Sequence, residues 1–146
     1  MATTRNARAH WEGSLLEGQG TVELTSSGIG TYPITWASRA ESADGRTSPE
    51  ELIAAAHASC FSMAFGNELA KRGFPPERLA VSASVTLDMT DAGRRVISSA
   101  LTVSGRVPGI DAATFAEIAE IAKSGCPISN ALKGNVTLSV EPTLEA

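Results

Sequence analysis

The chain has 146 residues, and 42% of them are hydrophobic, which is enough to build the core of one domain. Its formal net charge of −4 disfavours nucleic acid as the main partner, because phosphate binding requires a basic patch. No stretch approaches the roughly 18 apolar residues that span a bilayer, and the N-terminus lacks the apolar segment of a secretory signal. We therefore expect a single domain over residues 1–146 in the cytoplasm, with no membrane or nucleic-acid partner.

Short strands joined by glycine-containing turns are expected in the first third of the chain. Residues 21–24 and residues 32–36 are the clearest strand candidates, because β-branched, aromatic and apolar side chains are frequent in them. The polar residues 38–46 follow and are expected to form a loop.

A long helix is predicted to begin after Ser48. Ser48 suits the N-cap, Pro49 suits the first helical position, and Glu51 lies three residues after the cap, as in a capping box. The pattern continues until Gly73, where the helix is expected to end. Small residues allow another element to approach closely, so we expect a central, enclosed helix; they are Ala54, Ala55, Ala56, Ala58, Ser59, Ser62, Ala64 and Gly66.

A β-hairpin is predicted after this helix. Residues 79–89 alternate apolar and polar side chains, and residues 96–107 return with a similar alternation after a glycine-containing turn. Alternation of this kind is typical of strands with one buried face, so the hairpin should lie against the core.

Two further helices and a last strand complete the predicted order. Asp111 is placed to cap a helix that ends at Gly125. Cys126, followed by proline, opens a shorter helix that ends near Gly134, and residues 135–140 form the last strand. Segregated strands and helices in this order indicate an α+β fold with mainly antiparallel sheet and a long central helix.

The two cysteines, Cys60 in the long helix and Cys126 at the start of a short one, are the main candidates for chemistry. A structural disulfide is disfavoured in a reducing compartment, whereas a catalytic or transient disulfide is compatible with it. Cys60 lies too far from its helix N-terminus for the helix dipole to stabilise a thiolate, so it would need a cation from elsewhere. Backbone N–H groups at the N-cap favour the anion of Cys126. Local arguments therefore favour Cys126 as the nucleophile, and the alternative is that both cysteines are packing residues.

Four nearby side chains have ordinary explanations when each is taken alone. Glu51 completes the capping box, and Glu50 complements the dipole of the long helix. Arg39 lies in the polar loop and would be a surface charge. His57 precedes Cys60 by three residues on the helix, and it is either a base or a packed histidine.

Three segments resemble one protein family: TSPEELIAAAHASCFSMA (47–64), VPGIDAATF (107–115) and AKSGCPISNALKGNVTL (122–138). Together with AHWEG (9–13) they are similar to the osmotically inducible protein C (OsmC) and organic hydroperoxide resistance (Ohr) family, and to its OsmC branch in particular. The resemblance covers nearly the whole chain, and two cysteine motifs at this separation are highly specific. It implies an α+β fold assembled as an intertwined homodimer, with two active sites at the subunit interface.

The resemblance also implies roles for individual residues. Cys60 on the long helix is the peroxidatic cysteine, and Cys126 in the Cys-Pro motif is the resolving one. Arg39 matches the arginine that pairs with the attacking thiolate, and Arg46 in the same loop is the alternative. Glu50 matches the glutamate that orients this arginine. These assignments overrule the local preference for Cys126 as the first attacker.

The implied activity is that of a thiol peroxidase, which reduces organic hydroperoxides to alcohols and acts more weakly on hydrogen peroxide. The Cys60 thiolate would become a sulfenic acid and then form a disulfide with Cys126. An external dithiol, on the resemblance a dihydrolipoyl group of another protein, would reduce that disulfide. No metal, flavin or nicotinamide is expected in the peroxidase itself, and His57 receives no catalytic role.

Two alternatives use the same sequence features differently. A general thiol–disulfide exchange protein or redox sensor would use the cysteine pair with protein substrates and would consume hydroperoxide slowly. A non-catalytic binding domain would keep both cysteines in its core, where they would be inert to peroxide.

Overall fold

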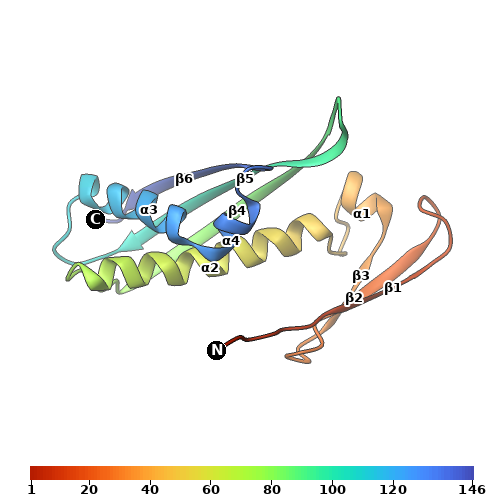
Figure 1. Cartoon of the computed structure of the whole chain (residues 1–146), viewed down its shortest axis with the longest axis horizontal. Helices are drawn as coiled ribbons and strands as arrows, with labels where there is room; N and C mark the ends of the chain where they lie inside the picture. The colour runs from red at the N-terminus through yellow and green to blue at the C-terminus, as the bar shows by residue number, and fades with distance from the viewer. The chain divides into compact units, whose positions relative to one another are not determined.

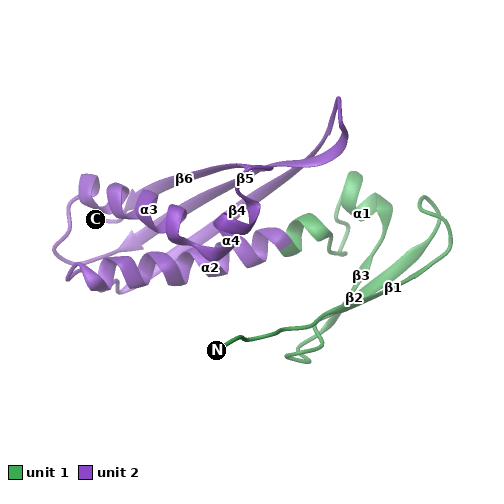
Figure 2. Cartoon of the chain, viewed as in Figure 1, with its two compact units in different colours: residues 1–52 green, residues 53–146 purple.

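The computed structural model describes residues 1–146, which divide into two compact units, Met1–Leu52 and Ile53–Ala146 (Figure 2). Each unit has a three-stranded sheet of its own, so the structure combines helices with mainly antiparallel sheet, as predicted. No helix is both long enough and apolar enough to cross a membrane. The expectation that the whole chain acts as one domain stays a prediction.

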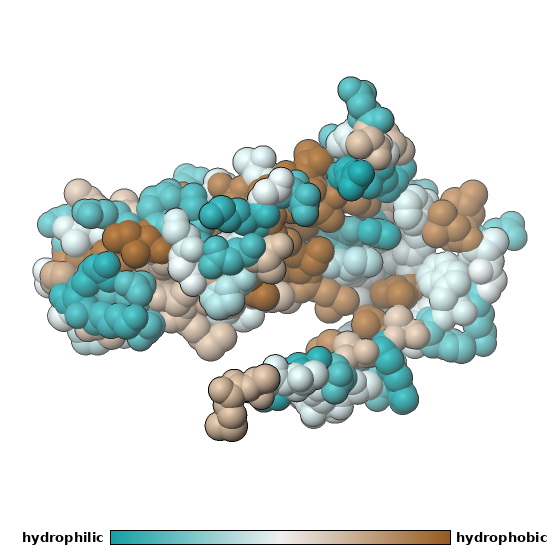
Figure 3. Space-filling model, viewed as in Figure 1, coloured by the Kyte–Doolittle hydropathy of each residue, from teal (hydrophilic) through white to brown (hydrophobic).

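The sheet of the first unit contains β1 (Arg8–Glu12), β2 (Gln19–Glu23) and β3 (Thr31–Ile34), paired antiparallel in that order (Figure 1). The two predicted strands are present, each ending slightly earlier than expected. Most side chains of this sheet are exposed in the single chain. Figure 3 colours the surface of the chain by hydropathy. The large apolar side chains exposed in this unit are Met1, Trp11, Leu15, Leu16, Ile29 and Tyr32.

A short helix, α1 (Trp36–Ala40), occupies part of the stretch that was predicted to be a loop. Its first residue had also been expected at the end of a strand. Both expectations are wrong within α1, whereas residues 41–46 contain no helix or strand, as predicted. Thr35 caps the helix: its hydroxyl accepts the backbone N–H of Ser38 at 3.0 Å, and the Ser38 hydroxyl accepts the backbone N–H of Thr35 at 3.0 Å. This is a capping box with serine at the position where glutamate or glutamine is the usual signal, which is why the sequence pattern missed it.

The long helix α2 (Pro49–Lys71) begins where it was predicted, and the Ser48 hydroxyl accepts the backbone N–H of Glu51 at 3.2 Å. Its buried face consists of residues spaced four apart: His57, Phe61, Phe65 and Leu69. The opposite face is exposed in the single chain and carries Ala55, Ala56, Ser59 and Met63. The expected enclosure of α2 is therefore wrong for the isolated chain, where one side of the helix is covered.

The second unit is built on β4 (Arg78–Thr90), β5 (Gly93–Arg106) and β6 (Thr137–Leu144), in the order β4-β5-β6. β4 and β5 form the predicted antiparallel hairpin. β6 pairs parallel to β5, because the chain crosses through two helices before it returns to the sheet. The parallel pairing is a feature that local sequence patterns did not predict.

Helices α3 (Ala112–Gly125) and α4 (Pro127–Leu132) form this crossover (Figure 1). Asp111 caps α3 as predicted, accepting the backbone N–H of Thr114 at 2.7 Å. The rings of Phe65 on α2 and Phe115 on α3 lie 5.0 Å apart between their centroids. The core forms where these helices meet the sheet, and its members are Phe61, Phe65, Leu69, Leu101, Val103, Val107, Phe115, Ile118, Ala119, Ala122 and Cys126.

Candidate active site

Cys126 is held at the junction of two helices by the backbone. It is the C-cap of α3 and the N-cap of α4, with extended backbone angles (φ −68°, ψ 122°), and Pro127 follows at the first helical position. Its carbonyl oxygen accepts the backbone N–H of Asn130 at 3.0 Å, which closes the first turn of α4. The side chain is fully buried. The thiol is therefore held within the core and cannot act on large partners directly.

Cys60 reaches the same place from α2. It is half-buried and packs against the core cluster, next to the buried face of the helix. Both cysteines are free thiols, and the Cys60 and Cys126 side chains lie close enough to influence each other. The structure thus brings together the two thiols that the sequence singled out.

The surroundings of the two thiols move their pKa values in opposite directions. Burial raises the pKa of Cys60, and contact with the Cys126 sulfur adds to this rise, although the backbone N–H of Ile128 opposes it. Burial also tends to raise the pKa of Cys126, but the Ser129 backbone N–H, the Cys60 thiol, the Ser129 hydroxyl and the Ile128 N–H outweigh it and lower that pKa. These N–H groups influence the Cys126 sulfur without forming the side-chain hydrogen bond of a regular N-cap. Its thiolate is nevertheless favoured by the start of α4, as the cap position predicted.

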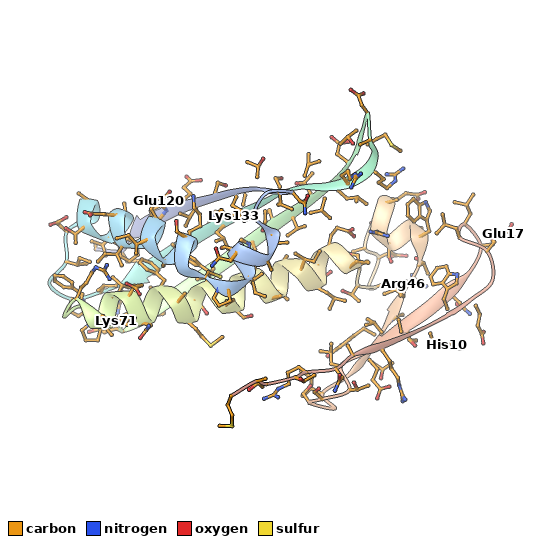
Figure 4. All side chains as sticks on the ribbon, in the orientation of Figure 1. His10, Glu17, Arg46, Lys71, Glu120 and Lys133 are labelled. Carbon is orange, nitrogen blue, oxygen red and sulfur yellow. The ribbon has the colours of Figure 1, made fainter.

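A cavity of about 470 Å³ lies beside Cys60 in the second unit. Its apolar lining includes Met63 and Ala64 from α2, Ala122 from α3, and Pro127. Lys71, at the C-terminal end of α2 (Figure 4), lines it together with Asn67 and Glu68. The Cys60 thiol therefore lies beside a cavity that has both an apolar and a polar part and is large enough for a small organic molecule.

Arg39 and Glu50 form a paired site in the first unit. The Arg39 guanidinium donates from Nε to both Glu50 carboxylate oxygens, at 3.0 and 3.1 Å, and from Nη2 to Oε1 at 2.8 Å. The Glu50 side chain is 9% exposed and that of Arg39 is 35% exposed. The guanidinium also lies 6.0 Å from the centre of the Trp36 ring. These contacts fix the orientation of the guanidinium, and no hydrogen bond engages its Nη1 group.

Arg46, the alternative arginine, has a different setting. It lies in the loop before α2 (Figure 4), and its Nη1 is 3.6 Å from a carboxylate oxygen of Asp44, which is itself exposed. A surface pair of this kind leaves the arginine free to sample many rotamers. Of the two arginines, Arg39 is the one held in place by a glutamate. Its expected pairing with Cys60 stays a prediction, because these residues belong to different compact units.

His57 is a buried residue whose environment the sequence did not reveal. Its Nδ1 lies 2.6 Å from the Ser99 hydroxyl on β5, and its Nε2 lies 2.8 Å from the Ser129 hydroxyl on α4. Burial lowers the pKa of His57, so the ring is neutral near pH 7. Its two partners are 42 and 72 residues away in sequence, and no local pattern could have identified them. No group of three or more potential metal ligands occurs in the structure.

Comparison with known proteins places this site in a family context. The model of the OsmC-like protein family matches residues 42–141. Peroxiredoxin OsmC of Escherichia coli is 44% identical over 141 residues, covering 97% of this chain and 98% of that protein. Organic hydroperoxide resistance protein OhrA of Bacillus subtilis is 28% identical over 133 residues, covering 89% and 86%. The crystal structure of OhrB from the same species has the same fold, with a TM-score of 0.72 at 22% identity over 94% and 98% of the two chains.

The different settings of the two arginines predict different effects on stability. Arg39→Ala should lower the free energy of unfolding by about 1–2 kcal/mol, because it leaves the buried Glu50 carboxylate without its bidentate partner. Arg46→Ala should change it by less than about 0.5 kcal/mol, because its ion pair is exposed. Urea unfolding followed by tryptophan fluorescence measures both, since both tryptophans lie in the unit that contains the arginines. Equal losses in the two variants would contradict the contrast drawn between them.

Proposed function

The chain belongs to the OsmC family, and on that premise we propose that it is a thiol peroxidase in which Cys60 attacks organic hydroperoxides and Cys126 resolves the product. The observation that carries the proposal is that the only two cysteines of the chain, both of them free, lie together at the same core cluster. The 44% identity to a protein named as a peroxiredoxin supports a peroxidase or redox function in general. The relative named for organic hydroperoxide resistance supports the choice of substrate class.

The first step is attack on the substrate by the Cys60 thiolate. Its sulfur bonds to the outer oxygen of the hydroperoxide while the O–O bond breaks, and the leaving alkoxide takes a proton from solvent to become an alcohol. Cys60 is oxidised to a sulfenic acid. The apolar part of the cavity beside Cys60 receives the alkyl group of the substrate, which favours organic hydroperoxides over hydrogen peroxide, a small and strongly hydrated molecule.

The thiolate of Cys60 requires a cation, because burial and the neighbouring sulfur both raise its pKa. We assign this cation to Arg39. Glu50 engages Nε and Nη2 of the guanidinium and leaves Nη1 for another acceptor, which is the geometry of an arginine prepared for an anion. Glu50 acts as the orienting residue, and Arg46 has no comparable partner.

The second step closes the disulfide. The Cys126 thiolate attacks the sulfenic sulfur of Cys60, the S–O bond breaks, and the departing hydroxide is protonated to water. The lowered pKa of Cys126 serves this step, because a thiolate is the attacking form. Little movement is needed, since the two side chains already lie in contact.

An external dithiol then restores both thiols, and we propose dihydrolipoyl groups of other proteins as its source.

The protein works as a homodimer in the cytoplasm without a metal, flavin or nicotinamide of its own. The exposed small residues on α2 and the exposed apolar side chains of the first unit offer surface for the second copy to bury. The reaction needs neither nucleic acid nor a membrane.

Substituting each cysteine separates the two steps. Cys60→Ser should abolish consumption of tert-butyl hydroperoxide, because no other group in the proposed mechanism attacks the peroxide. Cys126→Ser should still consume about one equivalent and stop at the sulfenic acid of Cys60, which a dimedone probe would label. Peroxide consumption is measured colourimetrically with reduced protein, and free thiols are counted before and after. Consumption at the parent rate by Cys60→Ser would overturn the assignment, and fast dithiol exchange with slow peroxide consumption by the parent would favour a thiol–disulfide exchanger.

The assignment of the cation is tested by a matched pair of arginine variants. Arg39→Ala should slow the oxidation of Cys60 at pH 7 by at least about tenfold, because each unit of pKa changes the thiolate fraction tenfold below the pKa. Arg46→Ala should react at the parent rate. Stopped-flow measurement of the first turnover provides both rates. If Arg46→Ala is the slower variant, the two arginines exchange roles while the cysteine assignments remain.

A further inference from the structure

His57 is the most deeply buried ionisable group that the mechanism above does not use. Its side chain is 0% exposed, and both of its ring nitrogens face hydroxyl groups, Ser99 at 2.6 Å and Ser129 at 2.8 Å. Ser99 and Ser129 are themselves buried, at 0% and 2% exposure. No buried polar side-chain atom in the structure is left without a partner, so this is a fully satisfied network. It joins α2, β5 and α4 beside the two cysteines.

A neutral histidine carries one ring N–H, so it donates to one serine and accepts from the other. If Nδ1 holds the proton, His57 donates to Ser99 and the Ser129 hydroxyl donates back to Nε2. If Nε2 holds the proton, Ser99 donates to Nδ1, and the Ser129 oxygen accepts from Nε2. In the second arrangement alone, the hydroxyl proton of Ser129 is free to be given to a further acceptor.

The further acceptor is the sulfur of Cys126. Cys126 is the N-cap of α4 and Ser129 is the third helical residue, the position from which a side chain reaches back to the cap. The Ser129 hydroxyl interacts with the Cys126 sulfur and, as a donor to it, favours the thiolate. The N–H of Lys133 donates to the Ser129 carbonyl at 2.9 Å, which fixes the backbone of Ser129 within α4.

We propose that His57 is a positioning residue for the resolving cysteine: oriented by Ser99, it holds the Ser129 hydroxyl as a donor to the Cys126 sulfur. The hydrogen bonds run in one direction, from Ser99 to His57 to Ser129 to Cys126. The network thereby stabilises the Cys126 thiolate without placing a second full charge in the core. Its value for disulfide closure rests on the proposed peroxidase function, whereas its effect on the Cys126 thiolate does not.

A purely structural role for the same network makes a different prediction. If His57 only joins α2, β5 and α4, loss of a hydroxyl should lower stability and leave the Cys126 thiolate unchanged. Ser99 distinguishes the two roles, because its hydroxyl bonds to His57 and is not one of the groups that act directly on the Cys126 thiol. The titratable groups that face Cys126 are Cys60 directly and His57 through Ser129.

The test measures the pKa of Cys126 from its thiolate absorbance near 240 nm, a readout that needs no reagent to enter the core. Cys60→Ser serves as the background so that Cys126 is the only thiol, and a protein lacking both cysteines supplies the blank. Ser129→Ala should raise the pKa of Cys126 by about one unit, since it removes a charge-assisted hydrogen bond. Ser99→Ala should raise it by a smaller but measurable amount, because the direction of the His57 hydrogen bonds is no longer enforced.

Ser104→Ala is the matched control on the same strand, because Ser104 bonds to Glu145 and lies outside the network. It should leave the pKa of Cys126 unchanged. Ser129→Thr keeps the hydroxyl, so its Cys126 pKa should stay near that of the parent.

An unchanged pKa of Cys126 in Ser129→Ala would overturn the whole proposal. A shift in Ser129→Ala with none in Ser99→Ala would overturn the part assigned to His57. Circular dichroism before titration identifies any variant that has not folded, and Ser99→Ala and Ser129→Thr provide independent outcomes if Ser129→Ala fails.

The consequence for resolution is measured separately in the two-cysteine protein. After one equivalent of tert-butyl hydroperoxide, Ser129→Ala should close the disulfide several-fold more slowly, with Cys60 oxidised at the parent rate. Equal closure rates in Ser129→Ala and the parent would contradict the role in resolution. If the parent itself consumes no hydroperoxide, the proposed function fails, and the titration of Cys126 still decides whether the network acts on the thiolate.

Discussion

The contact between the Cys60 and Cys126 side chains depends on how α2 packs against the junction of α3 and α4. The Phe65 and Phe115 rings join α2 to α3 within the core, and the His57–Ser129 hydrogen bond joins α2 to α4. α4 has only six residues, so it has little stability of its own and takes its position from these contacts. Core packing and a buried polar network therefore set the distance between the Cys60 and Cys126 sulfurs.

Sequence patterns predicted the elements whose signals are local. The Ser48 cap, the Asp111 cap and the alternation in the β4–β5 hairpin each depend on residues close together in the chain, and all three are present. The short helix α1 was missed because serine replaces the usual glutamate in its capping box. The parallel pairing of β6 and the partners of His57 were not predictable locally, because they are set by contacts between distant segments.

Local arguments alone do not predict the order in which Cys60 and Cys126 react. The start of α4 lowers the pKa of Cys126, and burial raises that of Cys60, so the second unit alone favours Cys126 as the thiolate. Family resemblance assigns the first attack to Cys60, which then depends on a cation from outside that unit. The bidentate pairing with Glu50 fixes the orientation of the Arg39 guanidinium, and we propose Arg39 as this cation. Within the second unit Cys126 is therefore the more acidic thiol. The reactivity of Cys60 depends on a cation that the second unit does not supply.

In the proposed mechanism, hydroperoxide converts Cys60 and Cys126 of one chain into a disulfide. The most direct measurement treats the reduced protein with one equivalent of tert-butyl hydroperoxide, blocks the remaining thiols, and maps a non-reduced digest by mass spectrometry. We expect one dominant cross-linked species that joins the Cys60 and Cys126 peptides, with the protein migrating as a single chain under denaturing, non-reducing conditions. Two unmodified cysteines after treatment, or a link between two Cys60 residues of different chains, would contradict it.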